Sequence, residues 1–393
     1  MAMSNCGYGW EALKTFDFLA VIDMWHTPML DMADVVMPCV HWLEAESPRC
    51  SQGASGGIGA TCKCIEPPGE CKIDYEIDIM LWKAMGRPWN NVEENPQWGE
   101  WPTAHEHLDW CVRDFEPAPT WDEYVEKFQR DGWWEAKDVY PERWGTYHRY
   151  EMGELRQIGA FTMYPTDGKP GFYTPTGKVE IWSTVMESYG LESTYEHYDY
   201  SLDDCMPIAR EPYVSPLTEP EKFEGDDVFN CTTGRRNPVY FHSEHRQLPW
   251  CREQWPVPRI EMNPDDAARL GLEQGDWVWI ENENGKIREV VDLYYGIAPG
   301  VVNLEHTWWY PEIDDVGHGW EHSAVNKLVY KDYNDPFCGS SSLRCYDVRV
   351  YKATPENSPF GNPVPCDSKG VPIITSADDA RLKEWLPVYE GRE

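Results

Sequence analysis

Two apolar runs near the start of the chain have the length of β-strands and lie a short distance apart. They cover residues 18–22 and 34–38, and a short helix is expected over 10–14 before them. A strand, a short crossover and a second strand are typical of a parallel sheet in an α/β fold. Apolar residues with helical spacing predict a further helix over 74–85, ended by Gly86-Arg87-Pro88.

From residue 227 onward the pattern changes to short strands separated by turns. Asn263 begins a capped helical turn that ends at Gly271, and Asn284-Gly285 is a strong hairpin signal. The predicted strands lie at residues 228–232, 277–281, 286–291 and 301–304. Several short strands with one small helix are typical of a closed or nearly closed β-barrel.

Between these portions the sequence is acidic, rich in tryptophan and largely aperiodic. We predict helical turns around 121–129, a turn into a strand over 176–182 followed by a short helix, a Gly-rich loop over 53–59, and a linker or wrapping arm over 203–224. The composition divides the chain into an α/β portion (1–90), an acidic Trp-rich region with its linker (91–224), a β-barrel (225–353) and a Pro-rich tail (354–393).

The charge balance excludes several classes of partner. Of the 393 residues, 34 are Lys or Arg and 68 are Asp or Glu, which gives a formal net charge of −34. Nucleic acids and anionic membrane surfaces are themselves polyanions, so neither is expected to bind. No apolar stretch approaches the roughly 18 residues of a membrane span, and the N-terminus lacks the features of a secretory signal. We therefore expect a cytoplasmic protein without a membrane span.

Cysteines and aromatic residues are both abundant. The 13 cysteines are an odd number scattered along the chain, which indicates reduced thiols rather than a disulfide scaffold. Cys50, Cys62, Cys64 and Cys71 have spacings that match none of the standard iron–sulfur or zinc runs, so free thiols are expected there. The 21 Trp, 22 Tyr and 11 Phe suit a large core or interface first, and flat ligands or sugars second.

Two loops of the barrel portion concentrate side chains that could carry chemistry. In residues 232–236 a glycine after a strand would let backbone amides and arginines approach a phosphate, although a turn with solvated arginines explains it equally simply. His242, Glu244 and His245 could line a polar ligand or hold a metal ion, but no partner motif at zinc spacing accompanies them. The standard signatures of nucleophilic, nucleotide-binding and zinc-protease sites are absent from the sequence, so no catalytic residue is assigned.

Six segments, taken in order, resemble one family. The matching segments are 21–29 with 33–38 and Glu44, 67–77, 233–235 with 242–244, 263–276, 308–312 and 326–328. Among them, Ala33-Asp34-Val35-Val36-Met37-Pro38 is similar to the family run ADVVLP, and 67–77 is similar to PPGEAKxDWEI. The family is the molybdopterin oxidoreductases of the dimethyl sulfoxide reductase type. The forms at 241–247 and 305–312 most resemble its branch of acetylene hydratase and the aromatic hydroxytransferases and dehydroxylases.

The resemblance implies a bis-molybdopterin guanine dinucleotide cofactor with molybdenum or tungsten. Asp23, with Thr27 beside it, matches the aspartate that accepts hydrogen bonds from the guanine edge, and a carboxylate suits the N–H donors of guanine. Asp74 matches a second cofactor-contacting acid, although a helix N-cap would explain it as well. The other implied contacts are Thr233, Gly234 and Arg235 at the pterin and phosphate, His242 and Ser243 beside the pterin, and Trp309, Asn326 and Arg344 (often Lys in the family) later in the chain.

The same resemblance implies the fold and the reaction class. We expect an α/β fold in which an incomplete Rossmann-like parallel sheet precedes a double-psi-type β-barrel. The implied chemistry is molybdenum-dependent redox or hydroxyl transfer on a small substrate, and the aromatic content favours an aromatic one. Family catalytic chains begin with a cysteine-ligated iron–sulfur segment and a domain with the metal ligand, and the match here starts after both. No metal ligand is therefore assigned in this chain.

The expected partners are the N-terminal half of the same enzyme, an iron–sulfur electron-transfer subunit, or both. Two other interpretations stay open at this point. One is a non-catalytic cofactor-binding remnant, and the other is an aromatic-rich module for glycans or protein interaction.

Overall fold

The two N-terminal apolar runs form a parallel pair of strands, as predicted. In the computed structural model, β1 (Ala20–Asp23) pairs with β2 (Val35–Pro38), and the 3₁₀ helix η1 (Pro28–Met32) lies in the crossover. Helix α1 (Cys6–Leu13) starts earlier than predicted because the side chain of Asn5 caps it by accepting the Tyr8 N–H. The structure describes residues 5–50, 57–89, 101–135, 157–158, 161–162, 176, 178–188, 202–209, 211–235, 237–332, 334–335, 339–359, 361–367, 370–375 and 379–383.

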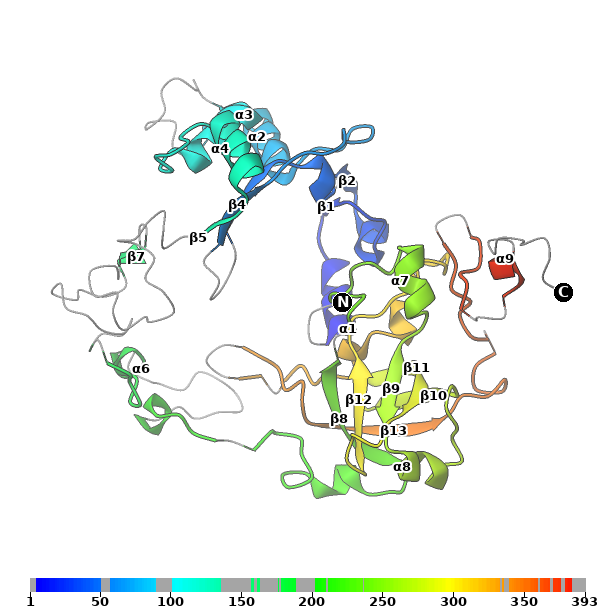
Figure 1. Ribbon diagram of the computed structural model, residues 1–393. Coiled ribbons are helices and arrows are strands. Elements are labelled where there is room, and N and C mark those ends of the chain that lie inside the picture. Colours follow the sequence, from blue (N-terminus) through cyan, green and yellow to red (C-terminus); the bar gives the residue numbers. More distant parts are fainter. Residues whose placement is uncertain are drawn as a thin grey trace.

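The C-terminal portion is a closed barrel, which confirms the barrel prediction (Figure 1). Its strands follow each other around the barrel in the order β10, β11, β9, β12, β8 and β13. Their bounds are β8 Val228–Arg235, β9 Arg259–Met262, β10 Trp277–Asn282, β11 Gly285–Leu293, β12 Val301–Glu305 and β13 Tyr346–Lys352. The pairs β8–β12 and β9–β11 are parallel, and the other pairs are antiparallel.

Local sequence signals set the turns of the barrel. Asn263 caps α8 (Pro264–Arg269) by accepting the Asp265 N–H, and Gly271 follows the helix with a φ of 66°. The Asn284-Gly285 signal closes the β10–β11 hairpin, with Asn282 opposite Gly285. The barrel interior is filled by fully buried apolar side chains, among them Ile260, Val278, Ile287, Val302 and Val348.

A second packed portion combines three helices with a small antiparallel sheet, away from the barrel in Figure 1. Its elements are α2 Asp74–Ala84, α3 Ala104–Val112, α4 Trp121–Asp131, β3 Ser47–Cys50, β4 Gly57–Thr61 and β5 Trp134–Glu135. The predictions of α2 and α4 are confirmed. Residues 57–59 belong to β4, so the loop prediction is wrong there, while 53–56 lie outside the described residues. Gly59 is required by packing, since an added Cβ would lie 2.7 Å from Phe128 and 2.9 Å from Trp133.

The predicted strand over 179–182 is absent from the described chain. Glu180 instead accepts hydrogen bonds from the backbone N–H groups and hydroxyls of Thr176 and Thr184, which holds an irregular turn before α6. The remaining short elements are η2 Trp42–Glu44, β6 Gln157–Ile158, β7 Phe161–Thr162, α6 Thr184–Ser188, η5 Leu202–Cys205, η6 Pro220–Phe223, α7 Pro249–Gln254, η7 Trp320–His322, η8 Val325–Lys327 and α9 Ala380–Lys383. None of the described helices is long and apolar enough to cross a membrane.

An aromatic cluster fixes the N-terminal segment to the barrel portion. Trp10 of α1 packs against Trp320 with ring centroids 5.2 Å apart, and Trp309 is buried in the same cluster. Met32 at the end of η1 packs against this cluster as well. The segment that follows β1 therefore lies against the loop region before η7, where several of the expected cofactor residues are found.

Candidate cofactor-binding site

Asp23 and Thr27, the residues expected at the guanine end, lie together at the C-terminal end of β1. The Thr27 hydroxyl donates to Asp23 Oδ2 at 3.0 Å, and the Trp25 N–H donates to Asp23 Oδ1 at 3.0 Å. A carboxylate has about four lone-pair positions, so acceptor capacity is left over. The carboxyl ends of parallel strands are where open α/β sheets bind ligands. Asp23 is thus oriented by its own loop and is still able to accept from a ligand.

Asp74 lies near Asp23, but it is not a helix N-cap. The N-cap of α2 is Ile73, and Asp74 is the first helical residue with an exposed side chain. Burial, and then the charges of Asp74 and Asp23, raise the pKa of the Cys39 thiol to about 11. A backbone bridge from Cys39 to Lys72 joins the end of β2 to the start of α2. The structure therefore brings both expected acids to one thiol.

The reactivity of Cys39 provides a test of this arrangement. Its pKa is raised from 9.0 to about 11, so at pH 8 the thiolate fraction should be roughly 100-fold below that of an ordinary thiol. We expect slow alkylation by iodoacetamide, which becomes several-fold faster in Asp23→Asn and in Asp74→Asn because each removes a negative charge. Peptide mass spectrometry measures the rate, and Glu44→Gln is the control. Equal rates in all four proteins would contradict the proximity.

Thr233, Gly234 and Arg235 are the C-terminal end of a strand, so the loop prediction for 232–235 is wrong. β8 continues to Arg235 because β12 pairs with it through a register shift between Leu304 and Glu305. Thr233 is tied to the segment before β13, since its N–H and its hydroxyl donate to the Leu343 carbonyl at 3.0 and 2.8 Å. The Arg235 side chain lies outside the described structure.

Gly234 and Arg344, which the resemblance implies as two separate cofactor contacts, lie next to each other. Gly234 has a φ of 100°, and an added Cβ would lie 3.2 to 3.4 Å from the Arg344 guanidinium. Arg344 is exposed, so its charge is available to an anion.

Alanine at position 234 should be destabilising for two reasons that can be separated. We expect Gly234→Ala to lower the free energy of unfolding by about 1–3 kcal/mol, from backbone strain at positive φ plus the contact with Arg344. Gly300 has a φ of 77° with open space around its missing Cβ, so Gly300→Ala measures the strain alone. Urea unfolding gives both values. A loss at 234 no larger than that at 300 would show that Arg344 does not crowd Gly234.

His242 and Ser243 lie in a loop with an unusual backbone. His242 has a φ of 50° and His245 a φ of 73°, and such values in residues other than glycine are uncommon and gather at functional sites. His242 Nδ1 lies 3.1 Å from His306 Nε2. The Trp309 indole N–H donates to the Ser243 carbonyl at 3.0 Å. His242, Ser243 and Trp309 are therefore brought together, with His306 as an addition.

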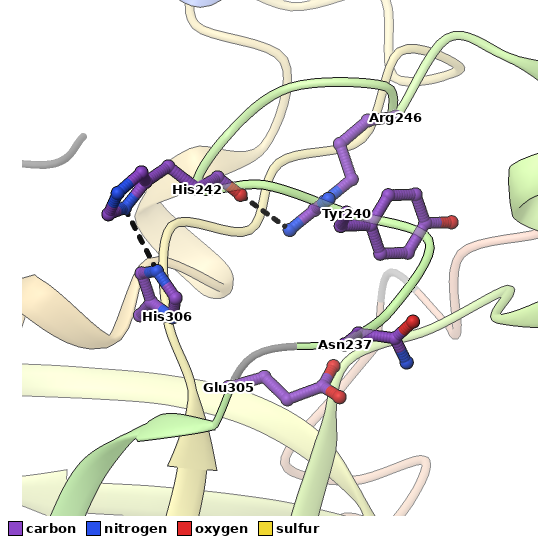
Figure 2. A pocket seen from close by; sticks show the side chains of 6 residues that line it. All are labelled: Asn237, Tyr240, His242, Arg246, Glu305 and His306. Atoms are coloured by element: carbon purple, nitrogen blue, oxygen red, sulfur yellow. Dashed lines mark hydrogen bonds between the residues drawn. The ribbon is translucent and has the colours of Figure 1, made fainter. Parts of the chain in front are cut away.

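A pocket opens beside this loop, and most of its lining was not predicted (Figure 2). The lining residues are Asn237, Tyr240, His242, Arg246, Glu305 and His306. Arg246 is 2% exposed. Its Cζ lies 3.8 Å from the ring centroid of Tyr240 and 4.3 Å from that of Trp308. Its guanidinium donates to the carbonyls of His242 and Glu244. Burial lowers its pKa to about 10, so it stays a cation at neutral pH.

Two donor atoms in the lining fit an acceptor-rich ligand. Arg246 Nε and Asn237 Nδ2 are buried and have no hydrogen-bond partner within the described chain. Buried donors are normally satisfied, and a pterin or phosphate offers oxygen and nitrogen acceptors. These two donors therefore suit the implied cofactor, whereas Glu305 in the same lining is an acid and could only accept from its N–H groups. Asn326 is also buried, in η8, but it is not among the residues that line this pocket.

The structure does not arrange His242, Glu244 and His245 as a set of metal ligands. His245 approaches Glu244 only at 3.9 Å, and His242 faces His306. Among the described residues, potential ligand atoms converge at His26, Asp31 and His318. Cys62, Cys64 and Cys71 form no disulfide within the described residues, whereas the side chain of Cys50 is outside the described structure.

The chain is similar to a known family of cofactor-binding domains and to known enzymes. Residues 229–345 match the family described as "Molydopterin dinucleotide binding domain". The chain is 50% identical over 435 aligned residues to the dopamine dehydroxylase of Eggerthella lenta, which covers 100% of this chain and 41% of that protein. It is 25% identical to the acetylene hydratase of Syntrophotalea acetylenica, over 88% of this chain and 41% of the relative.

The solved structure of acetylene hydratase from Pelobacter acetylenicus has the same fold over 90% of this chain and 43% of its own, with a TM-score of 0.67 and 22% identity. The chain thus spans about two fifths of the length of these relatives. Its barrel is a molybdopterin dinucleotide binding domain, and the cofactor of such domains is the bis-molybdopterin guanine dinucleotide of molybdenum or tungsten. The chain belongs with the molybdopterin oxidoreductases of the dimethyl sulfoxide reductase family, of which it corresponds to one part.

Proposed function

We propose that this chain holds the guanine and pterin ends of a molybdopterin guanine dinucleotide in an enzyme that removes a hydroxyl group from a catechol-type aromatic substrate. The observation that carries the proposal is that expected cofactor residues meet in pairs, two of which join segments that are distant in the chain. Asp23 meets Thr27, Gly234 meets Arg344, and Ser243 meets Trp309. The 50% identity to a dopamine dehydroxylase supports the substrate class.

The Asp23–Thr27 and Ser243–Trp309 pairs border one junction between the N-terminal sheet and the barrel portion. His26, next to Thr27, lies with Nδ1 3.0 Å from His318 Nε2. The His318 ring in turn lies 5.6 Å from the Trp309 ring, measured between centroids. The guanine-end residues and the pterin-side residues are therefore connected by a short chain of contacts.

Each part of this chain has a distinct task in the proposal. When bound, the cofactor supplies the two-electron chemistry, and the protein positions it. Asp23 accepts from the guanine edge, and Gly234 with Arg344 receives an anionic phosphate. Arg246 and Asn237 supply donors to the pterin side while the buried aromatic rings around Arg246 exclude water. No step of the reaction is assigned to a residue of this chain.

The N-terminal sheet supports the proposal that another part of the enzyme completes the fold. β1 and β2 are a two-stranded parallel sheet, and parallel sheets are normally covered on both faces. Here Ile22, Val35 and Val36 are 37%, 43% and 42% exposed. We propose that the part of the enzyme that lies outside this chain covers them, on the same or on a second polypeptide. An iron–sulfur subunit would then deliver electrons.

The glycan-binding alternative has less support. Trp121, Trp279, Trp308, Trp309 and Trp320 are among the largest fully buried side chains. These indoles build the core of the described chain and cannot stack on a sugar.

Anaerobic purification of the native protein tests the proposed function. Molybdenum, tungsten and the GMP released by acid hydrolysis are counted per polypeptide, and every co-purifying chain is identified. Near-stoichiometric metal and GMP, together with conversion of a catechol to a phenol, support the proposal. Metal and GMP without that conversion would overturn the substrate class, and an assembly with neither would leave the non-catalytic remnant as the better interpretation.

A further inference from the structure

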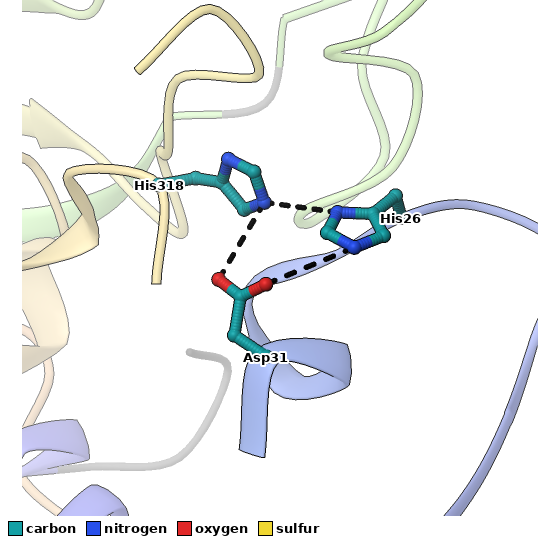
Figure 3. Close-up of side chains that lie close together, drawn as sticks. All are labelled: His26, Asp31 and His318. Carbon is teal, nitrogen blue, oxygen red and sulfur yellow. Dashed lines mark hydrogen bonds and ion pairs between the residues drawn. The ribbon is translucent and has the colours of Figure 1, made fainter. Parts of the chain in front are cut away.

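Three side chains that are not proposed to contact the cofactor converge where the N-terminal segment meets the barrel portion (Figure 3). His26 and Asp31 come from the segment after β1, and His318 comes from the loop before η7. One potential ligand atom from each lies within 4.8 Å of the others. His26 Nδ1 is 3.0 Å from His318 Nε2, and Asp31 Oδ2 is 3.6 Å from His318 Nε2.

The hydrogen bonds around His318 fix which of its nitrogens carries a lone pair. His318 Nδ1 lies 2.8 Å from the carbonyl oxygen of Ile313, and a carbonyl can only accept. The proton of a neutral imidazole is therefore on Nδ1, and Nε2 presents its lone pair to the cluster. This carbonyl–imidazole arrangement is the one that orients histidines toward metal ions in proteins.

His26 faces a lone-pair conflict unless a cation is present. With a neutral His318, the 3.0 Å contact requires His26 to donate through Nδ1, which leaves a lone pair on His26 Nε2. That lone pair points toward Asp31 Oδ1 at 3.8 Å. One unshared electron pair and a carboxylate charge thus face each other with no positive partner inside the cluster. Either a proton on His26 or a metal ion among the three residues would resolve the conflict.

The backbone around the cluster is built to hold this geometry. Gly317, His318 and Gly319 have φ values of 91°, 52° and 65°, so three successive residues are left-handed. An added Cβ at Gly317 would lie 2.5 Å from Trp320, and one at Gly319 would lie 2.7 Å from Ile313. A strained turn that the surrounding packing holds in place is typical of a preorganised site.

Asp31 is oriented independently of the two histidines. The Gly317 N–H donates to Asp31 Oδ2 at 2.7 Å, and the Asp31 side chain is only 16% exposed. The His318 side chain is 12% exposed, whereas the His26 side chain is 67% exposed. Two ligands are thus fixed by the protein interior, and the third closes over them from the surface.

We propose that His26, Asp31 and His318 bind one divalent transition-metal ion of the zinc class, which joins the N-terminal segment to the barrel portion. Two imidazoles and one carboxylate are ligands that such ions prefer. In the metal-bound state His26 carries its proton on Nε2 and ligates through Nδ1. Ligand atoms about 2.1 Å from a tetrahedral zinc ion lie about 3.4 Å apart. The separations of His318 Nε2 from His26 Nδ1, 3.0 Å, and from Asp31 Oδ2, 3.6 Å, therefore need only small shifts. Because His26 is exposed, a fourth position is open to water. None of the three ligands is among the residues proposed to contact the cofactor.

Zinc titration of the purified protein after chelator treatment tests the proposal. We expect one zinc ion per chain to bind at this site with micromolar or tighter affinity and to raise the melting temperature. Co²⁺ in its place should give visible d–d absorption. His318→Ala, Asp31→Asn and His26→Ala should each weaken zinc binding at least tenfold and abolish the rise in melting temperature.

A matched control comes from another surface histidine. His105 lies 3.9 Å from both Asp109 and Asp122, so His105→Ala removes an exposed imidazole beside two carboxylates without touching the cluster. It should leave zinc affinity unchanged. Since His26 is mostly exposed, His26→Ala remains informative if His318→Ala fails to fold. Wild-type zinc affinity in His26→Ala, or no zinc bound at micromolar concentrations in the wild type, would overturn the proposal in favour of a protonated His26.

Discussion

Replacement of Arg252 by alanine should lower the free energy of unfolding by about 3–5 kcal/mol, because it would leave a buried carboxylate without its cation. The Arg252 side chain is fully buried, and its guanidinium donates to both oxygens of Glu312 at 3.0 and 2.8 Å. The Glu312 side chain is only 6% exposed. The same guanidinium donates to the carbonyls of Pro256 and Arg246, so it also supports the loop that carries the pocket arginine.

The design of this test separates charge from packing. Urea unfolding of Arg252→Ala, Glu312→Gln and the double variant gives the coupling energy between the two side chains. The double variant should recover part of the loss, because it no longer buries a lone charge. Lys352 and Asp276 form an ion pair of 2.8 Å with a half-exposed lysine, and Lys352→Ala should cost less than about 1 kcal/mol. Equal losses for Arg252→Ala and Lys352→Ala would show that burial of the first pair has no energetic consequence.

The parts of the fold that follow from local signals could be predicted from the sequence. Asn263 and Gly271 bound a helix whose cap and end are set within a few residues. Asn284-Gly285 marks the β10–β11 hairpin, although the two turn residues are Glu283 and Asn284 and Gly285 is the first residue of β11. β9 and β13 were missed. β9 has only four residues, although Pro258 and Asn263-Pro264 bound it, and it is held by pairing with β11 and β12, which are distant in the chain. β13 pairs with β8 and β10, which are distant in the chain as well.

The sequence predicted individual residues of the candidate site but not which of them contact each other. Motif order placed Asp23, Thr27, Ser243 and Trp309 in the site, and the structure then showed their contacts. Sequence reasoning missed Tyr240 as a pocket residue although it lies two positions before His242. It also missed His306, since nothing near His306 in the chain marks it as a neighbour of His242. The only signal for His306 was its position beside the quoted Trp308-Trp309 motif.

The proposed metal site could not be predicted from sequence motifs, because its residues are far apart in the chain. His26 and His318 are separated by 292 positions, and only the packing of α1 and η1 on the barrel portion brings them together. The glycines that flank His318 are a local signal of an unusual backbone. They do not indicate which side chain the histidine will meet.

Substitution of Asp23 by asparagine should weaken retention of the guanine end of the cofactor roughly 100-fold, or about 3 kcal/mol. Guanine presents N–H donors along this edge, and a carboxylate accepts them with both oxygens, whereas an amide offers one oxygen and one opposing donor. Asparagine can still accept from Thr27 or Trp25 through that oxygen, so the loop itself should persist. GMP and molybdenum per polypeptide, counted after gel filtration of the complete assembly, measure the loss.

The matched control is Asp34→Asn at the start of β2, which makes the same change of charge on the same sheet. Asp34 Oδ2 accepts the Leu19 N–H at 2.8 Å, a bond that an amide oxygen can replace. We expect Asp34→Asn to retain wild-type GMP. If both variants lose GMP equally, the sheet's stability or charge controls retention, and if Asp23→Asn loses none, Asp23 does not contact the guanine. A selective loss in Asp23→Asn together with zinc binding unchanged from the wild type would show that the guanine contact and the His26–Asp31–His318 cluster act independently, although both follow the same strand.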